Sequence, residues 1–404
     1  MKRLNETKRK VLICDPISFV SGHHVSFNYI IINAAILEAK NIKIKLLLDE
    51  SVLKTISEKI PEFSEYFDYS TNLISCKDSH SKGFIMKAKW LKTFFLNYIR
   101  AFKLTKREKY IGIFFTDFET ISFFVALLFF KLLNMSKKYF KIGIVVHNSI
   151  DEIYSSILFK GKIKRFFLEY IFLNVDVIVV LEEYIKKQAL NIINSSLEKK
   201  FIVAKYPVLD MTNSIINETH ETSRRRIFFV GTASKSKGID LLLEALKMLD
   251  AKYYKFLEIG IFGNIENTKL LMDYEEVLKK IKVRNEFIPH SEYYEYIRQA
   301  EYLFMLQTKY QARVSGALFD AFSFNKPVIS ISKILRYYED YYGPLGFVIP
   351  ADVYSLCSTL ISIARREDKE KYIEFIKNIE KFKKDHSLEQ FYIKIREVIR
   401  LLYE

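Results

Sequence analysis

A polar loop bounded by two glycines carries the residues best suited to hold a phosphate group. It follows the apolar run 226–230 and extends from Gly231 and Thr232 to Lys237 and Gly238, where an amphipathic helix is expected to begin. Backbone N–H groups at a helix N-terminus, the positive end of the helix dipole and an ammonium group together suit a pyrophosphate. A plain strand-to-helix turn with a solvated lysine would show the same pattern, so both interpretations stay open.

A second segment, residues 313–330, adds residues that suit the rest of a nucleotide. Ser315 and Gly316 are expected to begin a helix whose N–H groups point at a ligand, and Asp320 follows one turn later. A carboxylate in that place can accept hydrogen bonds from the vicinal hydroxyls of a ribose. Arg313, just before the helix, is a candidate contact for the phosphates or the sugar of the same ligand.

Four residues of the first half could take part in the chemistry. His147 and Asp117 each follow an apolar, strand-like run, and His23 and His24 lie just beyond the first such run. Histidine titrates near neutral pH and a carboxylate can act as a base, so His23, His24 or Asp117 could deprotonate an acceptor hydroxyl. The structural alternatives are that His147 bonds to nearby backbone and that His23 and His24 merely flank a helix start.

The elements that position these residues alternate between strand-like and helical patterns, which is typical of parallel α/β units. Because the strand-like runs are almost continuously hydrophobic, we expect strands covered by helices on both faces. Ligands bind beyond the carboxyl ends of such strands. The expected strands are residues 10–14, 42–48, 110–115, 141–147, 175–181 and 201–204 in the first half, and 226–230, 255–261, 285–288, 302–306, 327–330 and 346–349 in the second.

The phosphate loop resembles that of the GT-B glycosyltransferases of family 4. Gly231, Lys237, Gly238, Asp240 and Leu242 match the spacing of the family's donor loop. The resemblance implies an α/β fold of two doubly wound Rossmann-like domains that face each other across a cleft. It also implies a nucleoside-diphosphate sugar as donor, with its diphosphate held by the lysine. We expect no metal cofactor, because a lysine and helix termini can neutralise the leaving diphosphate.

The segment 313–330 resembles the same family's Glu-x7-Glu block, with departures. Asp320 replaces the second glutamate of that block, and Ala312 stands where the first one is expected. Thr232 replaces an arginine of the donor loop, and a neutral hydroxyl binds a diphosphate more weakly than a guanidinium does. The resemblance places His147 near the donor sugar and the reacting centre.

The resemblance suggests a division of the chain into four parts. Residues 1–205 are expected to form an N-terminal, acceptor-binding Rossmann-like domain, and residues 226–385 a C-terminal domain that binds the nucleotide sugar. Residues 206–225 lack an apolar period and are typical of a linker. Residues 386–404 contain a helix that we expect to pack back toward the N-terminal domain.

Charge is distributed unevenly along the 404 residues, which carry a net +15. Residues 1–205 hold 33 Lys/Arg against 20 Asp/Glu, whereas residues 206–404 hold 30 against 28. This asymmetry predicts an anionic partner for the first half. The three cysteines are scattered and form no CxxC pair, which fits a reducing compartment. The longest near-continuous apolar stretch, 121–130, is shorter than the roughly 18 residues that a spanning helix needs.

An amphipathic helix expected over residues 86–104 points to an anionic membrane surface as that partner. It carries the only tryptophan, and ten basic residues but two acidic ones lie between residues 77 and 109. A basic helix with a tryptophan suits the bilayer interface, although its aromatic residues could instead pack on the domain core. Residues 160–165 form a second basic patch. The residues expected to face the membrane are Lys89, Trp90, Lys92, Arg100 and Lys103.

The sequence therefore favours a hexosyltransferase-type enzyme that is cytoplasmic and peripheral on the inner face of the cell membrane. Its acceptor would be a lipid-linked glycan, of the kind used for lipopolysaccharide or capsule, and no nucleic-acid module is recognisable. Retention or inversion at the anomeric carbon stays open. Two alternatives remain: a catalytically inactive GT-B partner subunit or glycan-binding module, and a sugar-nucleotide epimerase on the same fold.

Overall fold

The computed structural model describes residues 9–17, 23–60, 63–71, 73–74, 84–132, 140–154, 156, 158–193, 195–209, 211, 224–266, 272–307 and 310–404, with the backbone alone at His23, His24, Phe84, Ile85, Leu158 and His290. The chain forms two compact units, each with its own sheet. Unit 1 comprises Met1–Tyr206 and Glu389–Glu404, and unit 2 comprises Pro207–Leu388.

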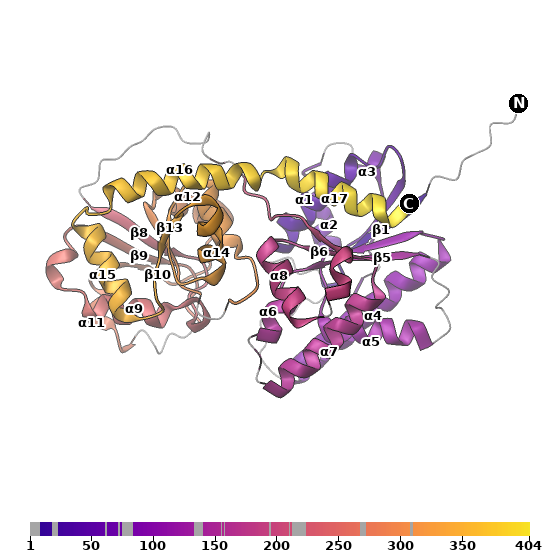
Figure 1. The fold of residues 1–404 in the computed structure, drawn as a ribbon, viewed down its shortest axis with the longest axis horizontal. Coiled ribbons are helices and arrows are strands. Elements are labelled where there is room, and N and C mark those ends of the chain that lie inside the picture. The colour runs from indigo at the N-terminus through magenta and orange to yellow at the C-terminus, as the bar shows by residue number, and fades with distance from the viewer. Residues whose placement is uncertain are drawn as a thin grey trace, which may run out of the picture. The chain divides into compact units, whose positions relative to one another are not determined.

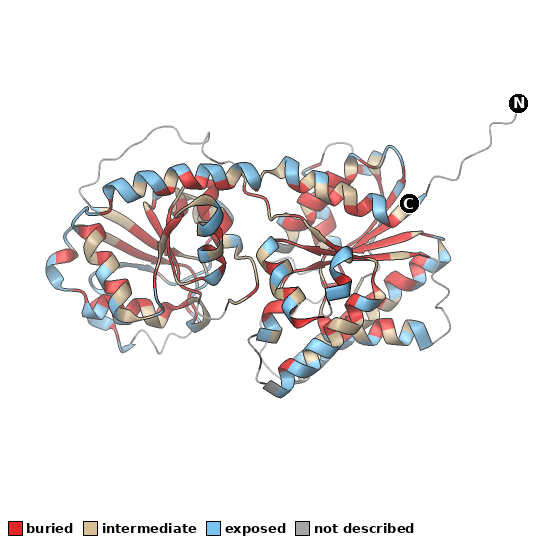
Figure 2. Cartoon of the chain, viewed as in Figure 1, coloured by how far each residue is buried: buried red, intermediate tan, exposed pale blue. Residues whose placement is uncertain are grey.

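Unit 1 is built on a seven-stranded sheet in the order β3-β2-β1-β4-β5-β6-β7, with every neighbouring pair parallel. The order reverses between β1 and β4, so this is the topological switch point of a doubly wound sheet. Strands β4 and β6 are buried along their whole length, and β1 and β5 at every residue but the first, as helices on both faces require (Figure 2). The strands are β1 Lys10–Cys14, β2 Lys43–Leu47, β3 Phe67–Ser70, β4 Gly112–Phe115, β5 Lys141–Val146, β6 Val177–Val180 and β7 Phe201–Val203.

Helices cover both faces of this sheet, with α1, α2 and α17 on one side and α4, α5 and α7 on the other (Figure 1). The helices of unit 1 are α1 His23–Ile36, α2 Glu50–Ser57, α3 Phe63–Tyr66, α4 Phe84–Arg107, α5 Thr120–Leu132, α6 Ser149–Tyr154, α7 Leu158–Asn174, α8 Glu183–Ile192, the 3-10 helix η1 Ser195–Lys200, and α17 Leu388–Tyr403. None of the helices in the described residues is long and apolar enough to cross a bilayer.

The C-terminal helix α17 is held in unit 1 by a buried carboxylate and a glycine. Glu38 is fully buried and accepts hydrogen bonds from Arg396 Nε and Arg400 Nη2, each at 2.8 Å. Burial alone would raise the pKa of Glu38, but the two arginines outweigh it and hold the pKa below its ordinary value. A Cβ at Gly112 of β4 would lie 2.6 Å from the Leu402 carbonyl oxygen, so only glycine lets the helix approach this closely.

Unit 2 repeats the doubly wound plan with a six-stranded parallel sheet in the order β10-β9-β8-β11-β12-β13. Its switch point lies between β8 and β11. The strands are β8 Arg225–Val230, β9 Leu257–Phe262, β10 Lys282–Arg284, β11 Tyr302–Met305, β12 Val328–Ser330 and β13 Gly346–Val348. The helices are η3 Lys235–Lys237, α9 Ile239–Met248, η4 Ala251–Tyr253, α11 Glu275–Leu278, α12 His290–Gln299, α13 Gly316–Ser323, α14 Lys333–Tyr342, α15 Val353–Ala364 and α16 Lys369–Asp385.

Two strands depart from the sequence-based expectation, and both lie at a sheet edge. The strand expected at residues 285–288 is wrong, because β10 spans Lys282–Arg284 and ends before it. An edge strand such as β10 pairs on one side only and tolerates exposed polar residues. Its sequence therefore lacks the continuous hydrophobic run that predicts a buried strand. The other edge strand, β3, was missed for the same reason: two of its four residues, Asp68 and Tyr69, are exposed.

Candidate functional site

The residues that suit a nucleotide gather at the switch point of the unit 2 sheet. The loop after β8 begins at Gly231, which has a φ of 104°, and ends at Gly238, which has a φ of 77°. A Cβ at Gly238 would lie 2.3 Å from the carbonyl oxygen of Leu306, just beyond β11. Glycine therefore allows the N-terminus of α9 to sit directly on the end of the neighbouring strand.

Two cations converge at this point. Lys237 closes the 3-10 turn η3, and its pKa is lowered by burial and, next, by the positive charge of Arg313, while Glu266 acts in the opposite direction. The guanidinium of Arg313 lies 3.9 Å from the ring centre of Tyr310. Its Nε is buried and has no hydrogen-bond partner in the part of the chain that the structure describes. A bound anion would relieve the repulsion between the cations and satisfy that N–H group.

A carboxylate on α13 is connected to the phosphate loop through a tyrosine. Burial raises the pKa of Asp320 to about 6, and the hydrogen bond from Tyr293 works against that shift. Tyr293 donates its hydroxyl to Asp320 Oδ2 at 2.9 Å. The same ring lies 3.8 Å from the Cβ position of Gly231. Tyr293 thus connects the carboxylate to the phosphate loop.

The remaining donor candidates surround this core of the site. Ser315 is the N-cap of α13, and Gly316 opens its first turn with nothing within 4 Å of its Cβ position. The first N–H groups of an α-helix lack an acceptor within the helix, so the start of α13 has donors to offer a ligand. Thr232 is exposed, whereas Ala312 is fully buried. A buried methyl group therefore occupies the place of the glutamate in the resembled motif.

At the switch point of unit 1, polar side chains bind one another. Asn28 Nδ2 donates to Asp15 Oδ2 at 2.5 Å, and Thr116 Oγ1 donates to Asn28 Oδ1 at 2.7 Å. His147 Nε2 lies 3.0 Å from the Thr116 carbonyl oxygen. All four residues are buried, with His147 the most accessible at 8% exposure. This chain of hydrogen bonds joins the carboxyl ends of β1, β4 and β5 through α1.

The four candidate catalytic residues therefore have different surroundings. His147 bonds to backbone, as one of its two sequence interpretations described, and its ring packs edge-on against Phe27 at 4.6 Å. Asp117 is half-buried and accepts a hydrogen bond from the Phe118 N–H at 2.7 Å. The side chains of His23 and His24 lie outside the described residues, although their backbone begins α1.

The helix expected to face a membrane, α4, presents its basic residues outward and its aromatic residues inward. Lys89, Lys92, Arg100 and Lys103 are exposed, and Trp90 is half-buried. Of the two interpretations of this helix, the packing of aromatic residues on the domain core holds for three of them, which are buried in unit 1. The inward aromatic residues are Phe94, Tyr98 and Phe102.

Comparison with known proteins yields solved structures alone: no family model matches the sequence, and no curated protein matches it. A glycosyltransferase from Rickettsia africae is 15% identical over 98% of both chains, with a TM-score of 0.63. The Anabaena protein Alr3699/HepE, in complex with UDP and glucose, is 11% identical, with 97% of this chain and 99% of that chain covered and a TM-score of 0.63. UDP-GlcNAc 2-epimerase from Neisseria meningitidis, bound to UDP-GlcNAc, is 15% identical, with coverages of 97% and 99% and a TM-score of 0.57.

The chain has the GT-B fold. Both GT-B units are doubly wound parallel sheets, and the similarity extends over nearly the whole chain. Within the described residues of this GT-B chain, no cluster of three His, Cys, Asp or Glu side chains is placed to hold a metal ion.

Sequence reasoning missed Tyr293 and the hydrogen-bonded partners in unit 1. Tyr293 is one of three tyrosines in the amphipathic helix α12, and the sequence gives no reason to assign a role to one of them rather than another. Asp15 and Thr116 directly follow the expected strands 10–14 and 110–115, so their position at a carboxyl edge was a usable signal. Asn28 had no such signal, since it lies inside α1 and reaches both residues only through folding.

Proposed function

We propose that this GT-B protein is a glycosyltransferase that moves a sugar from a nucleoside-diphosphate sugar to a membrane-associated acceptor. The observation that carries the proposal is the convergence of Lys237 and Arg313 at the switch point of unit 2, with Asp320 connected to the same loop through Tyr293. Ligands bind at switch points in doubly wound sheets. Glycosyltransferases and UDP-bound proteins among the solved structures of this fold support it.

In this proposal each part of the donor has a partner. Lys237 and Arg313 bind the diphosphate and stabilise the negative charge that develops on it as the sugar departs. The N–H groups at Ser315 and Gly316 add neutral donors, and Asp320 accepts hydrogen bonds from ribose hydroxyls. Two cations and a helix terminus suffice to neutralise a diphosphate, so we propose a reaction that needs no metal.

Unit 1 would then present the acceptor hydroxyl. If the reaction inverts the anomeric carbon, a base must take the proton of that hydroxyl. We propose Asp117, His23 or His24 for this role, and assign to His147 a contact with the donor sugar. Asp117 is the half-buried carboxylate at the carboxyl end of β4, so it combines the chemistry of a base with a place at the edge where ligands bind.

A surface of α5 and α7 supports a bilayer as the place of the acceptor. Along α5, Ile121, Val125, Phe129 and Leu132 are all exposed on one side. An apolar side chain on the outer face of a helix is expected to be covered by another apolar phase. Figure 2 shows the adjoining α7 with a largely exposed N-terminal half.

The adjoining part of α7 combines apolar and basic residues. Phe159 and Phe166 are 74% and 59% exposed, and the intervening Lys160, Lys162 and Arg165 are exposed as well. Aromatic side chains flanked by cations suit the headgroup region of an anionic bilayer. We therefore propose that unit 1 docks peripherally on the inner face of the cell membrane through α5 and α7.

Sedimentation with lipid vesicles tests the docking surface. We expect the protein to co-sediment with vesicles that contain anionic phospholipid, and the Phe159→Ser/Phe166→Ser variant to lose most of that binding. Tyr354→Ser is the matched control, because Tyr354 of unit 2 is 75% exposed, close to the 74% of Phe159. Equal losses in the variant and the control, or no binding by the wild type, would refute the docking surface.

A thermal-shift experiment with a panel of nucleoside diphosphates tests the donor site. UDP at about 100 times its dissociation constant should add roughly 2.7 kcal/mol to the stability of the folded protein. Lys237→Ala should weaken binding by about 2–3 kcal/mol because a charge-assisted contact is lost, while Lys235→Ala, at an exposed lysine in the same loop, should not. No stabilisation by any nucleotide would instead favour the inactive partner subunit or glycan-binding module.

A second candidate function is a UDP-sugar epimerase, since the solved structures of this fold include UDP-GlcNAc 2-epimerases. An epimerase changes its sugar nucleotide with no acceptor present. Incubation of the protein with UDP-GlcNAc alone, followed by separation of the sugars, distinguishes the two functions. Conversion without an acceptor would replace the transferase proposal.

A further inference from the structure

Unit 1 contains a cavity of about 580 Å³ that the donor and acceptor residues do not use. It lies between the C-terminal half of α4 and the carboxyl ends of β2 and β3, where Leu47 and Ser70 contribute to the wall. A volume of this size is typical of small-molecule sites. The cavity belongs entirely to unit 1, at strands on the outer edge of the sheet and away from the switch point between β1 and β4.

Three cations line this cavity. Arg100, Lys103 and Arg107 stand at positions i, i+3 and i+7 of α4, so they share one face of the helix. The hydroxyl-bearing Ser70 and Thr71 complete the polar part of the wall, and leucines form the apolar part. No acidic side chain occurs among the described residues that line the cavity.

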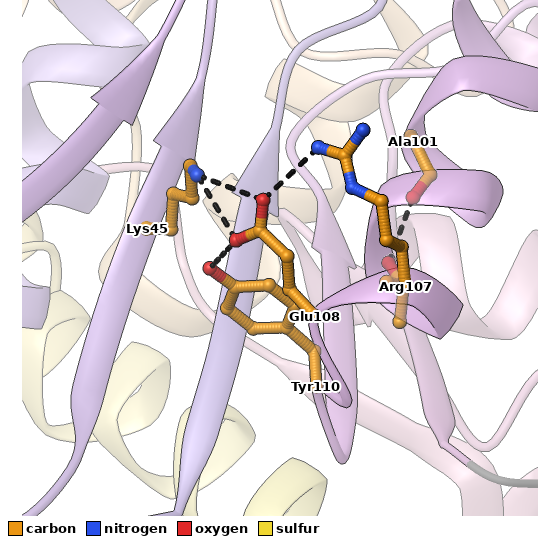
Figure 3. Close-up of polar contacts among 6 residues, drawn as sticks. Lys45, Ala101, Arg107, Glu108 and Tyr110 are labelled. Atoms are coloured by element: carbon orange, nitrogen blue, oxygen red, sulfur yellow. Dashed lines mark hydrogen bonds and ion pairs between the residues drawn. The ribbon is translucent and has the colours of Figure 1, made fainter.

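An adjacent carboxylate, that of Glu108, binds one of the three cations, Arg107 (Figure 3). Glu108 accepts hydrogen bonds from Lys45 Nζ and Tyr110 Oη, both at 3.0 Å, and from Arg107 Nη2 at 3.1 Å. Burial alone would raise the pKa of Glu108, but these three donors outweigh it and lower the pKa. Glu108 thus has two cationic partners, of which Arg107 lines the cavity and Lys45 does not.

We infer that this cavity binds the phosphate group of an organic ligand, with Arg100, Lys103 and Arg107 as its cationic partners. Guanidinium groups bind phosphate oxygens in bidentate fashion, and Ser70 and Thr71 add neutral donors. The leucine part of the wall suits the apolar remainder of such a ligand. The identity of that ligand as the phosphorylated acceptor rests on the proposed transferase function, but the phosphate site itself does not. Its source is either a soluble phosphate ester or the headgroup of a lipid.

Calorimetric binding with two probes tests the inference. The probes are inorganic pyrophosphate, and dihexanoyl phosphatidate kept below its micelle concentration. All proteins carry Lys237→Ala, so that the donor site of unit 2 contributes little. The test variant adds Arg100→Gln/Lys103→Gln, and the control adds Lys87→Gln/Lys106→Gln, which removes the same charge from exposed positions of α4 outside the cavity.

We expect the test variant to raise the dissociation constant about tenfold or more, and the control to change it less than about twofold. Preference for phosphatidate over pyrophosphate identifies a lipid headgroup, and equal binding identifies a soluble phosphate. If the double variant does not fold, Lys103→Glu at an exposed side chain replaces it. Equal losses in test and control, or no binding by the protein with an intact cavity, would overturn the inference. UDP binding by the protein with an intact Lys237 reports separately on the proposed function.

Discussion

The two switch points of this protein have the same strand order, but they differ in whether their buried polar groups are paired with one another. In unit 1, Asp15, Asn28, Thr116 and His147 are buried and hydrogen-bonded to one another. In unit 2, Lys237 and Arg313 repel each other, and a buried N–H group of Arg313 has no partner within the described residues. The polar groups at the unit 1 switch point are thus hydrogen-bonded by their own side chains. Those at the unit 2 switch point can still bind a ligand.

This difference shows that two sheets with the same strand order need not both bind a ligand at their switch points. Buried polar groups that are fully paired add stability, whereas charges that repel each other cost stability until a ligand binds. We therefore expect mutations at the unit 1 edge to change stability and mutations at the unit 2 edge to change nucleotide affinity. The predictions below test this separation, from the largest expected effect to the smallest.

Asp15→Ala should lower the free energy of unfolding by about 3 kcal/mol, because the Asn28 amide and the Ile17 N–H lose a buried acceptor. Urea unfolding followed by the transition of unit 1 measures this loss. UDP affinity of the folded variant should stay unchanged. Asp117→Ala serves as control and should cost less than about 1 kcal/mol, because the Asp117 side chain is half-buried whereas that of Asp15 is fully buried. A cost for Asp15→Ala no larger than that of the control would contradict the comparison.

Asp320→Asn should stabilise the protein above pH 6 and not below pH 4. The pKa of Asp320 is raised from its ordinary 3.8 to about 6, so the folded state favours the protonated form. That contribution to stability is present below pH 4 and is lost as the pH rises through 6. The variant lacks this loss, so its advantage over the wild type should grow by about 2 kcal/mol between pH 4 and pH 7. Urea unfolding at several pH values checks the slope.

The same variant should remove a pH dependence of donor binding. In the wild type, affinity for UDP-glucose should increase as the pH rises through about 6, since the ionised carboxylate is the better acceptor for ribose hydroxyls. UDP-glucose is the ligand of choice because its diphosphate diester has no proton to lose in this range. An affinity that rises equally in Asp320→Asn would place the titrating group elsewhere.

Gly316→Val should weaken UDP binding about tenfold, an effect of roughly 1.4 kcal/mol. Nothing lies within 4 Å of the Cβ position, so the free protein can accept the side chain, but a ligand at the first turn of α13 would meet it. The melting temperature without nucleotide should stay nearly constant, and Gly316→Ala should have a smaller effect than Gly316→Val. Unchanged affinity in both variants would show that the ligand does not approach this turn.

Tyr293→Phe should produce the smallest change, about 1 kcal/mol. Without the hydroxyl, Asp320 loses the hydrogen bond that lowers its pKa, so the pKa should move further above 6. The midpoint of the pH dependence of UDP-glucose binding should therefore shift to higher pH, while affinity at pH 8 stays close to the wild type. Tyr294→Phe is the control, because the hydrogen bond to Asp320 comes from Tyr293. A midpoint that moves equally in both variants would remove the special role of Tyr293.

Much of the fold was predictable because local patterns carry it. Strand β1 was predicted with its observed bounds, and the helix expected over residues 86–104 corresponds to α4. The surroundings of the aromatic face of α4 were not predictable. Phe94, Tyr98 and Phe102 would have the same spacing whether they faced a bilayer or, as observed, the core. Helical periodicity shows which residues form an apolar face, but it does not show whether protein or lipid packs on that face.

By itself the sequence determined the two doubly wound halves and the glycine-bounded loop with Lys237, since hydrophobic period and glycine placement are local signals. Only the tertiary structure decided which polar groups meet. It paired Asn28 with Asp15 and Thr116, placed Tyr293 on Asp320, and brought Arg313 to Lys237. The physical reason is that strand order, which no local pattern encodes, determines which carboxyl ends become neighbours and hence which charges and hydrogen bonds must be balanced.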